Sequence, residues 1–171
     1  MKPFLPFVCL AIGAMLVAPV AHAQDTSAKG AGGNLSSLKQ VTALLPHNLL
    51  VSLLNSAGKE AAASQATDIL RQKAEGQTAA FKCKIDRVEK DPRKEQGKDG
   101  YRIKAEDSFV REGAANFKAY LWIHFNLTEN DKVSAMKKGG EISVTGKITL
   151  ASVTAQGVLE LHVDLSDATV N

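Results

Sequence analysis

The sequence predicts an α+β protein that is mainly β: a five-stranded barrel preceded by a short N-terminal helical segment. From Thr78 onward, alternating apolar and polar residues indicate three strands, then a short helical stretch, then two more strands. This order places a helix between the third and fourth strands. Gly146 interrupts the fourth strand, as expected where a small barrel must bend sharply to close.

Residues 1–23 have the features of a secretory signal peptide. Lys2 gives a positive start, an apolar run follows over residues 4–20, and Ala21-His22-Ala23 supplies the small-residue cleavage pattern. The alternative is a single membrane anchor, but prolines interrupt the run and no basic flank follows it. We therefore expect cleavage after Ala23 and a periplasmic or secreted protein.

The mature chain would carry little net charge. The chain has 21 Lys and Arg against 18 Asp and Glu, and loss of Lys2 leaves 20 against 18, a net charge of +2. Charge alone therefore predicts neither a nucleic-acid nor a membrane partner. Cys83 would be the single remaining cysteine, so no internal disulfide is expected. No other apolar run is long enough to span a bilayer.

Residues 35–76 have a leucine-rich helical pattern, and the small, Gly-rich residues 24–34 before them are expected to form a flexible linker. Pro46 is expected to open a second helix, Gly58 to end it, and Gly76 to end a third. Such a short segment cannot bury its own core, so its leucines are expected to pack on the barrel, on another copy or on a partner. The apolar residues recur at steps of three or four and so lie on one stripe of a helix: Leu35, Leu38, Val41, Leu45, Leu49 and Leu53.

The five expected strands lie in the stretches AFKCKIDRVEKD, YRIKAED, KAYLWIHFN, EISVTGKITLASV and VLELHVDLSDATV. The charged residues 89–100 are expected to be a loop, residues 108–117 a connection, and residues 127–140 the short helix. Three strands, a helix and two strands within residues 78–171 follow the order of an OB-fold barrel. The alternative is an open α+β sandwich with helices on one face.

Two stretches carry a family resemblance. MKKGGEISVTGKITL, followed by LELHVDLSDATV, resembles the closing half of the OB-fold domains called tRNA_anti-like, and TAAFKCKIDRVEKD resembles their opening strand. The resemblance covers about residues 78–170, extends to small exported bacterial OB-fold proteins, and implies a binding module. The opening strand departs from the pattern, because it has Asp86-Arg87 where such strands often carry a glycine. The family name reflects a likeness to anticodon-binding domains and does not itself imply RNA binding.

The outward positions of the first three strands combine cations with aromatic rings. Between Lys82 and Lys104 there are nine Lys and Arg against five Asp and Glu, a local net charge of +4. Aromatic rings stack on bases or sugars, cations attract anionic groups, and this sheet face is the usual ligand surface of an OB-fold. We therefore expect an anionic ligand, a glycan or a nucleic acid, to bind Lys82, Lys84, Arg102, Lys104, Tyr120, Trp122 and His124.

The alternative is that the leucine-rich helices cover this face. Tyr120 and Trp122 offer the apolar surface that the leucine stripe needs. The chain would then be a structural component of an envelope complex, with oligomerisation possible through the helices. What contacts Trp122 distinguishes the two hypotheses.

No sequence pattern indicates catalysis. Glu160, His162 and Asp164 share one face of the last strand, but side chains two residues apart diverge, so we expect a solvated face and no metal site. No phosphate loop, dinucleotide fingerprint, zinc-cluster spacing or nucleophile elbow occurs. We therefore expect a non-enzymatic binding protein without a cofactor.

Overall fold

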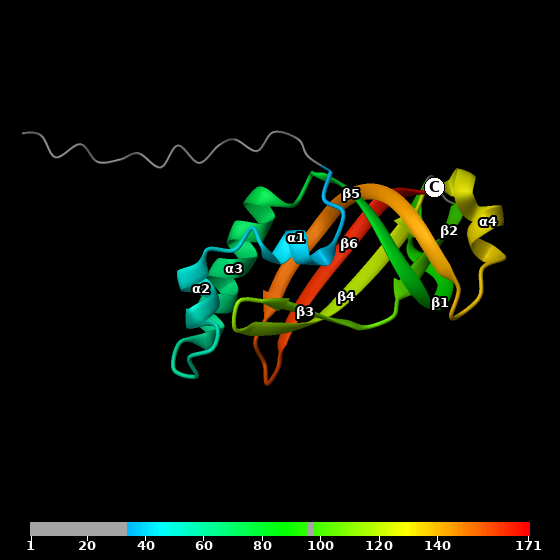
Figure 1. Ribbon diagram of the computed structural model, residues 1–171. Helices are drawn as coiled ribbons and strands as arrows, with labels where there is room; N and C mark the ends of the chain where they lie inside the picture. The colour runs from blue at the N-terminus through cyan, green and yellow to red at the C-terminus, as the bar shows by residue number, and fades with distance from the viewer. Residues whose placement is uncertain (1–33, 96–97) are drawn as a thin grey trace, which may run out of the picture.

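A computed structural model describes residues 34–95 and 98–171, so the expected signal peptide and all but the last residue of the expected linker lie outside the described residues. The chain is mainly β, with short helices ahead of the sheet (Figure 1). The six strands are β1 Thr78–Glu95, β2 Lys98–Ala105, β3 Ser108–Glu112, β4 Ala115–Phe125, β5 Glu141–Thr154 and β6 Leu159–Val170.

Five of these strands close into a ring. The strands pair in the order β1, β2, β4, β6, β5 and back to β1. Every pairing in this ring is antiparallel except that of β4 with β6, which is parallel. Such a closed five-stranded Greek-key barrel is the OB-fold. The fold class predicted from the sequence is confirmed.

The strand β3 lies where the sequence predicts only a connection, over residues 108–117. Both β2 and β3 pair with the same edge of β4, β2 opposite residues 122–124 and β3 opposite residues 115–119. A tight turn at Gly113, which has a φ of 58°, joins β3 to β4. Together, β2 and β3 therefore serve as the second strand of the barrel.

Gly146 allows β5 to bend, as the sequence predicts. The register between β5 and β6 shifts between Thr145 and Lys147, which marks a bulge at the glycine. A Cβ atom at this position would lie 3.1 Å from the carbonyl oxygen of Ser166 and 3.2 Å from Cβ of Ala168. Close approach of the neighbouring strand therefore requires glycine here.

The predicted helix between the third and fourth strands of the barrel is present but short. It consists of a 3-10 turn, Leu127–Glu129, and α4, Asn130–Ser134. Asn126 accepts a hydrogen bond from the backbone N–H of Thr128 and so caps the turn. Val133 is fully buried and fixes the helix to the barrel.

The segment before the sheet forms three helices: α1 Leu38–Thr42, α2 His47–Ser52 and α3 Lys59–Lys73. Leu35 is not helical, because its backbone bridges to Ala79 of β1. Gly58, the predicted end of the second helix, directly precedes α3. The third helix ends at Lys73, three residues before the predicted Gly76. No helix in residues 34–95 or 98–171 is long and apolar enough to cross a bilayer.

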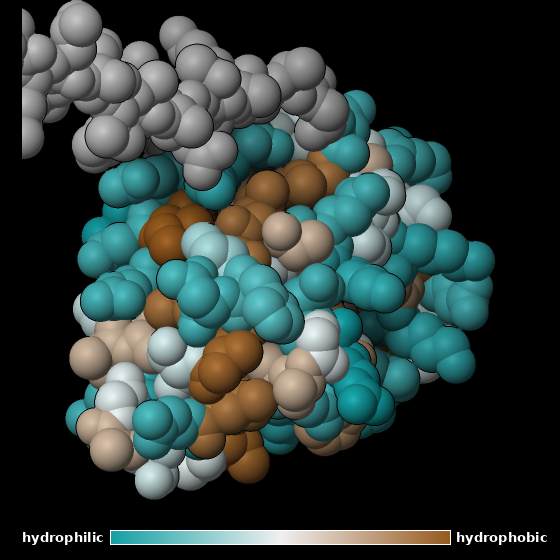
Figure 2. All heavy atoms as spheres, turned by 60° about the vertical axis from the view of Figure 1, so that its left-hand side comes forward, coloured by the Kyte–Doolittle hydropathy of each residue, from teal (hydrophilic) through white to brown (hydrophobic). Residues whose placement is uncertain are grey.

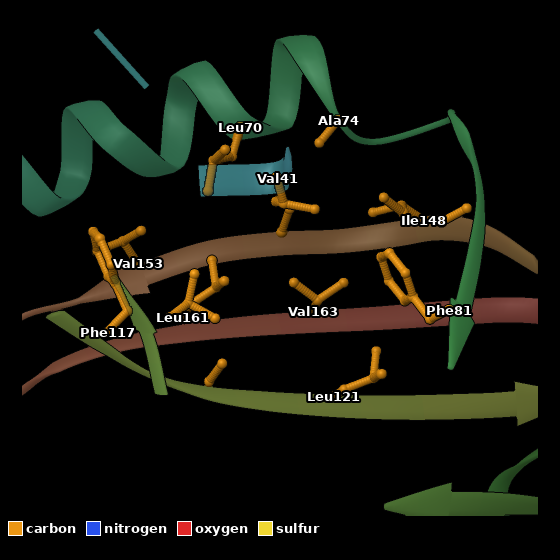
Figure 3. Close-up of a cluster of buried hydrophobic side chains, with 14 of the residues drawn as sticks. Val41, Leu70, Ala74, Phe81, Phe117, Leu121, Ile148, Val153, Leu161 and Val163 are labelled. Carbon is orange, nitrogen blue, oxygen red and sulfur yellow. The ribbon is translucent and has the colours of Figure 1, made fainter. Parts of the chain in front are cut away.

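The helices pack on the inner side of the sheet. Leu70 of α3 and Val41 of α1 are fully buried and face Leu161 and Val163 of β6 (Figure 3). Thr67 hydrogen-bonds both backbone groups of Val153, at 3.0 and 3.1 Å, and so holds α3 along β5. The helical segment therefore completes the core of the barrel.

This packing corrects the hypothesis that the helices cover the Tyr120–Trp122 face. Successive side chains of a strand point to opposite faces. Leu121 belongs to the cluster beneath the helices (Figure 3). Its neighbours in β4, Tyr120 and Trp122, therefore point away from this cluster. Of the helices, α1 and α3 pack against strands of the sheet and α2 packs against α3, while the two aromatic rings lie on the outside of the barrel.

Candidate ligand-binding face

The outer face of the barrel is the outward surface of the second half of β1 together with β2, β3, β4 and β6. Trp122 lies near its centre, and two guanidinium groups lie over its ring, that of Arg102 at 4.1 Å and that of Arg87 at 5.2 Å from the centroid. Glu89 accepts a 2.7 Å hydrogen bond from Nε of Arg102 and lies 3.5 Å from Arg87. One carboxylate thus holds both cations against the indole.

Tyr120 lies one step along β4 on the same face. Its ring stacks on His162 of β6, with centroids 4.9 Å apart, and its hydroxyl donates to Glu160 at 3.2 Å. The ammonium groups of Lys104 and Lys118 lie 5.4 and 5.0 Å from the centroid of the ring. Each of the two aromatic residues therefore has two cations beside it.

These cations do not form an unopposed basic surface. Asp107 accepts a hydrogen bond from Lys104 at 2.7 Å and lies 3.2 Å from Lys118. The bond from Lys104 is the main cause that lowers the pKa of Asp107. Asp86 pairs with Lys138 at 2.9 Å and approaches Lys104 at 3.8 Å. Carboxylates thus offset most of the local positive charge that the sequence count indicates.

His124 points to the outer face but is covered, with 4% of its surface exposed. Its Nδ1 lies 2.6 Å from Asp91, which also accepts hydrogen bonds from the backbone and side chain of Arg93. Its Nε2 lies 3.9 Å from Asp164, whose pKa is raised by burial. His124 is therefore a buried residue held by Asp91 and offers no exposed surface to a ligand.

Lys82 and Lys84 lie apart from the aromatic residues. Lys82 pairs with Glu141 of β5 at 3.0 Å. The first half of β1 pairs with β5 and the second half with β2, with a bulge between Ile85 and Arg87. The bulge reverses which residues point outward, so Arg87 takes the place beside Trp122 that the strand pattern assigns to the two lysines.

Phe109 is a member of the outer face that the sequence reasoning missed. It is 71% exposed and lies opposite Lys118 in the β3–β4 register, diagonal to Tyr120. A signal was present in SFVRE, because the buried Val110 alternates with Phe109 and Arg111, which leaves a phenylalanine on the polar side. Phe109, Tyr120 and Trp122 therefore form a line of three aromatic residues.

Glu160 and His162 of β6 form hydrogen bonds with other residues of the outer face. Nε2 of His162 lies 3.3 Å from Glu160, and Glu160 also accepts from Thr154. No cluster of three or more metal-ligating side chains occurs within the described ranges 34–95 and 98–171. The arrangement is that of a hydrogen-bonded surface network.

No protein-family model and no curated protein matches this chain, so membership of the tRNA_anti-like family stays a prediction. Among solved structures, it is similar to a proposed nucleic acid-binding lipoprotein from Klebsiella pneumoniae, with 12% identity over 74% of this chain and 99% of that one and a TM-score of 0.40. It is similar to the small single-stranded DNA-binding protein of Streptomyces coelicolor, with 8% identity over 55% and 93% of the chains and a TM-score of 0.34. A third is the Plasmodium falciparum SSB in complex with single-stranded DNA, with 10% identity over 54% and 90% and a TM-score of 0.32.

Proposed function

We propose that this chain is a non-enzymatic binding protein that holds an extended anionic ligand, a nucleic acid strand or a charged glycan, on the outer face. The observation that carries the proposal is the line of Phe109, Tyr120 and Trp122 on the strands that correspond to the second and third strands of the barrel. Ligands of OB-folds usually bind on these strands.

The chemistry of the face suits a chain of rings joined by anionic groups. Exposed Phe109 offers an open ring to a base or a sugar, and Lys118 lies opposite it in register. Stacking on aromatic residues tolerates many sequences, because every base or sugar ring has a flat side. The paired carboxylates weaken the electrostatic attraction of anions to this face. The proposed affinity for the anionic ligand is therefore moderate and falls as the salt concentration rises.

We further propose that the protein is exported. The support is the signal-peptide pattern of residues 1–23 in the sequence, which ends with small residues before Gln24. The protein would then bind its ligand in the periplasm or outside the cell.

A partner protein is the second candidate, supported by a separate observation. Val51 of α2 and Leu54, just after this helix, are 54% and 50% exposed. The helix lies on the left of Figure 1, the side that Figure 2 brings forward, where apolar side chains reach the surface. Apolar residues left exposed on a packed helix are common at protein contacts. Sedimentation of Val51→Ser/Leu54→Ser beside the unsubstituted protein tests whether they hold copies together.

Trp122 is the only tryptophan in the chain, so its fluorescence reports on the outer face alone. We would titrate the protein with a short oligothymidylate, with polygalacturonate and with neutral dextran, at about 50 mM and about 200 mM salt. One of the two anionic polymers should change the emission and dextran should not. The polymer that does so identifies the ligand class.

The matched variants are Phe109→Ala on the outer face and Val158→Ala, another exposed apolar residue, at the β5–β6 turn. Loss of one stacking ring should weaken binding by about 1–3 kcal/mol in Phe109→Ala and leave Val158→Ala unchanged. Trp122→Ala, followed by direct binding of labelled polymer, should behave like Phe109→Ala. Equal affinity in all variants, or no response to either polymer, would contradict the proposal.

A further inference from the structure

A second site lies where the wall of the barrel is incomplete. The first half of β1 pairs with β5, and β3 pairs with β4, but β1 and β3 do not pair with each other within the described part of the chain. A cleft of about 450 Å³ opens there, bounded by β1, the start of α1 and the connection from β2 to β3. Its volume lies in the range of small-molecule sites.

The floor of the cleft is apolar. Phe81 and Leu121, each 3% exposed, and Val110, 8% exposed, belong to the inner face of the barrel and reach the cleft from three different strands. The gap between β1 and β3 therefore gives access to side chains that elsewhere are sealed inside the core. Contact with this floor favours a ligand with an apolar body.

The rim of the cleft carries lysines. Lys39 and Lys84 are both exposed, and neither pairs with a carboxylate among residues 34–95 and 98–171. Lys82 is paired with Glu141. Two acidic residues also line the rim, but Asp107 is held by Lys104 and Lys118, which leaves Glu106. Glu141, which pairs with Lys82, also attracts Lys84 without forming an ion pair with it. The rim therefore favours an anionic group.

We propose that this cleft binds a small amphipathic anion, an apolar molecule with one carboxylate or phosphate group, with its apolar body on Phe81 and Leu121 and its anionic group between Lys39 and Lys84. This site differs from the outer face, because Lys82 and Lys84 lie on the half of β1 before the bulge. It does not depend on the proposed function of the outer face.

Cys83 provides a reporter inside the cleft. It is half-buried in the wall, and burial raises the pKa of its thiol to about 11. A molecule seated on Phe81 would cover the thiol and slow its alkylation further. The rate at Cys83 can be followed in the full-length chain by mass spectrometry of its own peptide, apart from that of Cys9.

The experiment measures N-ethylmaleimide addition to Cys83 in the presence of octanoate, octanol or acetate. Octanoate should protect the thiol at lower concentration than octanol, and acetate should not protect it. In Lys39→Gln/Lys84→Gln, protection by octanoate should need about five to ten times more ligand, as expected for two partly exposed charge contacts, and protection by octanol should stay the same.

The control variant, Lys73→Gln/Lys147→Gln, removes two exposed lysines that do not line the cleft. It should keep the full response to octanoate. Three outcomes would overturn the proposal: no protection by octanoate, equal loss of protection in both double variants, or equal protection by acetate. Trp122 emission recorded in parallel should not respond to octanoate, which keeps this result separate from any result on the outer face.

Discussion

The guanidinium group of Arg102 lies 4.1 Å from the centroid of the Trp122 ring, across the β2–β4 pairing. The side chain of Arg102 is 23% exposed, and Glu89 fixes it by a 2.7 Å hydrogen bond from Nε. Arg102 therefore shields one side of the indole from water, and a ligand that stacks there must either displace the guanidinium or extend the stack over it.

Arg102→Gln should expose Trp122 to water. We expect a red shift of the tryptophan emission and a loss of about 0.5–1 kcal/mol in the free energy of unfolding, the size of one cation–π contact near the surface. In Arg102→Lys both changes should be smaller than in Arg102→Gln but still detectable, because an ammonium group cannot lie flat on the ring. Arg71→Gln, on the exposed side of α3, is the control and should change neither quantity. An unchanged emission in Arg102→Gln would show that the arginine does not cover the indole in solution.

Asp107→Asn should strengthen binding of the anionic polymer. Asp107 holds both Lys104 and Lys118, so its neutralisation frees Lys118 and leaves Lys104 with only its 3.8 Å contact to Asp86. We expect an affinity gain of about two- to tenfold at low salt and a steeper decrease as salt rises, because more cations would then contact the ligand. Asp68→Asn, which frees Arg71 on α3, should leave the affinity unchanged. Weaker binding in Asp107→Asn would mean that the carboxylate itself contacts the ligand.

The barrel should depend on its N-terminal helices. Leu70 of α3 is fully buried, whereas Leu54, just after α2, is 50% exposed. Leu70→Ala should lower the free energy of unfolding by about 2–5 kcal/mol, and Leu54→Ala should lower it by less than about 0.5 kcal/mol. Chemical denaturation of the two variants measures both. Similar small losses would show that the helices do not stabilise the sheet.

Gly146→Ala should destabilise the barrel where β5 bends. The added methyl group would lie 3.1 Å from the carbonyl oxygen of Ser166 and 3.3 Å from the Cα of Ala168, both on the neighbouring strand. We expect a loss of about 1–3 kcal/mol, the usual effect of overpacking. Gly58→Ala meets no atom within 4 Å and is the control. A thermal melt that shifts equally in both variants would argue against close packing at the bend.

Strand alternation predicts the faces of the barrel but not across a bulge. In β1 the outward residues are Lys82 and Lys84 before the bulge, and Arg87 and Glu89 after it. A single extra residue exchanges the two faces of a strand, and its position depends on the pairing with β2 rather than on the local sequence. Alternation alone therefore predicts two lysines on a surface that Arg87 occupies.

Alternation also says nothing about what covers a face. It places His124 beside Trp122 correctly, but Asp91, 33 positions earlier in the chain, buries the imidazole. The leucine stripe likewise predicts an apolar helix face and leaves open which surface it packs on. Contacts between residues far apart in the chain decide both questions, and one sequence does not contain them explicitly.

The stability of the protein should depend on Asp164 in a way that pH reveals. Burial raises the pKa of Asp164 in the folded protein, so the folded state holds this proton to a higher pH than the unfolded chain does. As pH rises from the unfolded pKa toward the folded pKa, this group therefore lowers the stability, and the cost stays constant above both values. Asp164→Asn removes the charge, so its melting temperature should exceed that of the unsubstituted protein at about pH 7 and equal it at about pH 3.

Asp131→Asn, an exposed carboxylate on α4, is the control for this measurement and should follow the unsubstituted protein at each pH. The informative contrary result is a lower melting temperature of Asp164→Asn at neutral pH. Arg93, Arg102 and His162 favour the ionised form of Asp164, so such a loss would mean that the charges around this carboxylate stabilise it by more than its burial costs. The sign of the difference at neutral pH therefore reports which effect is larger at Asp164, its burial or the attraction of the neighbouring positive groups.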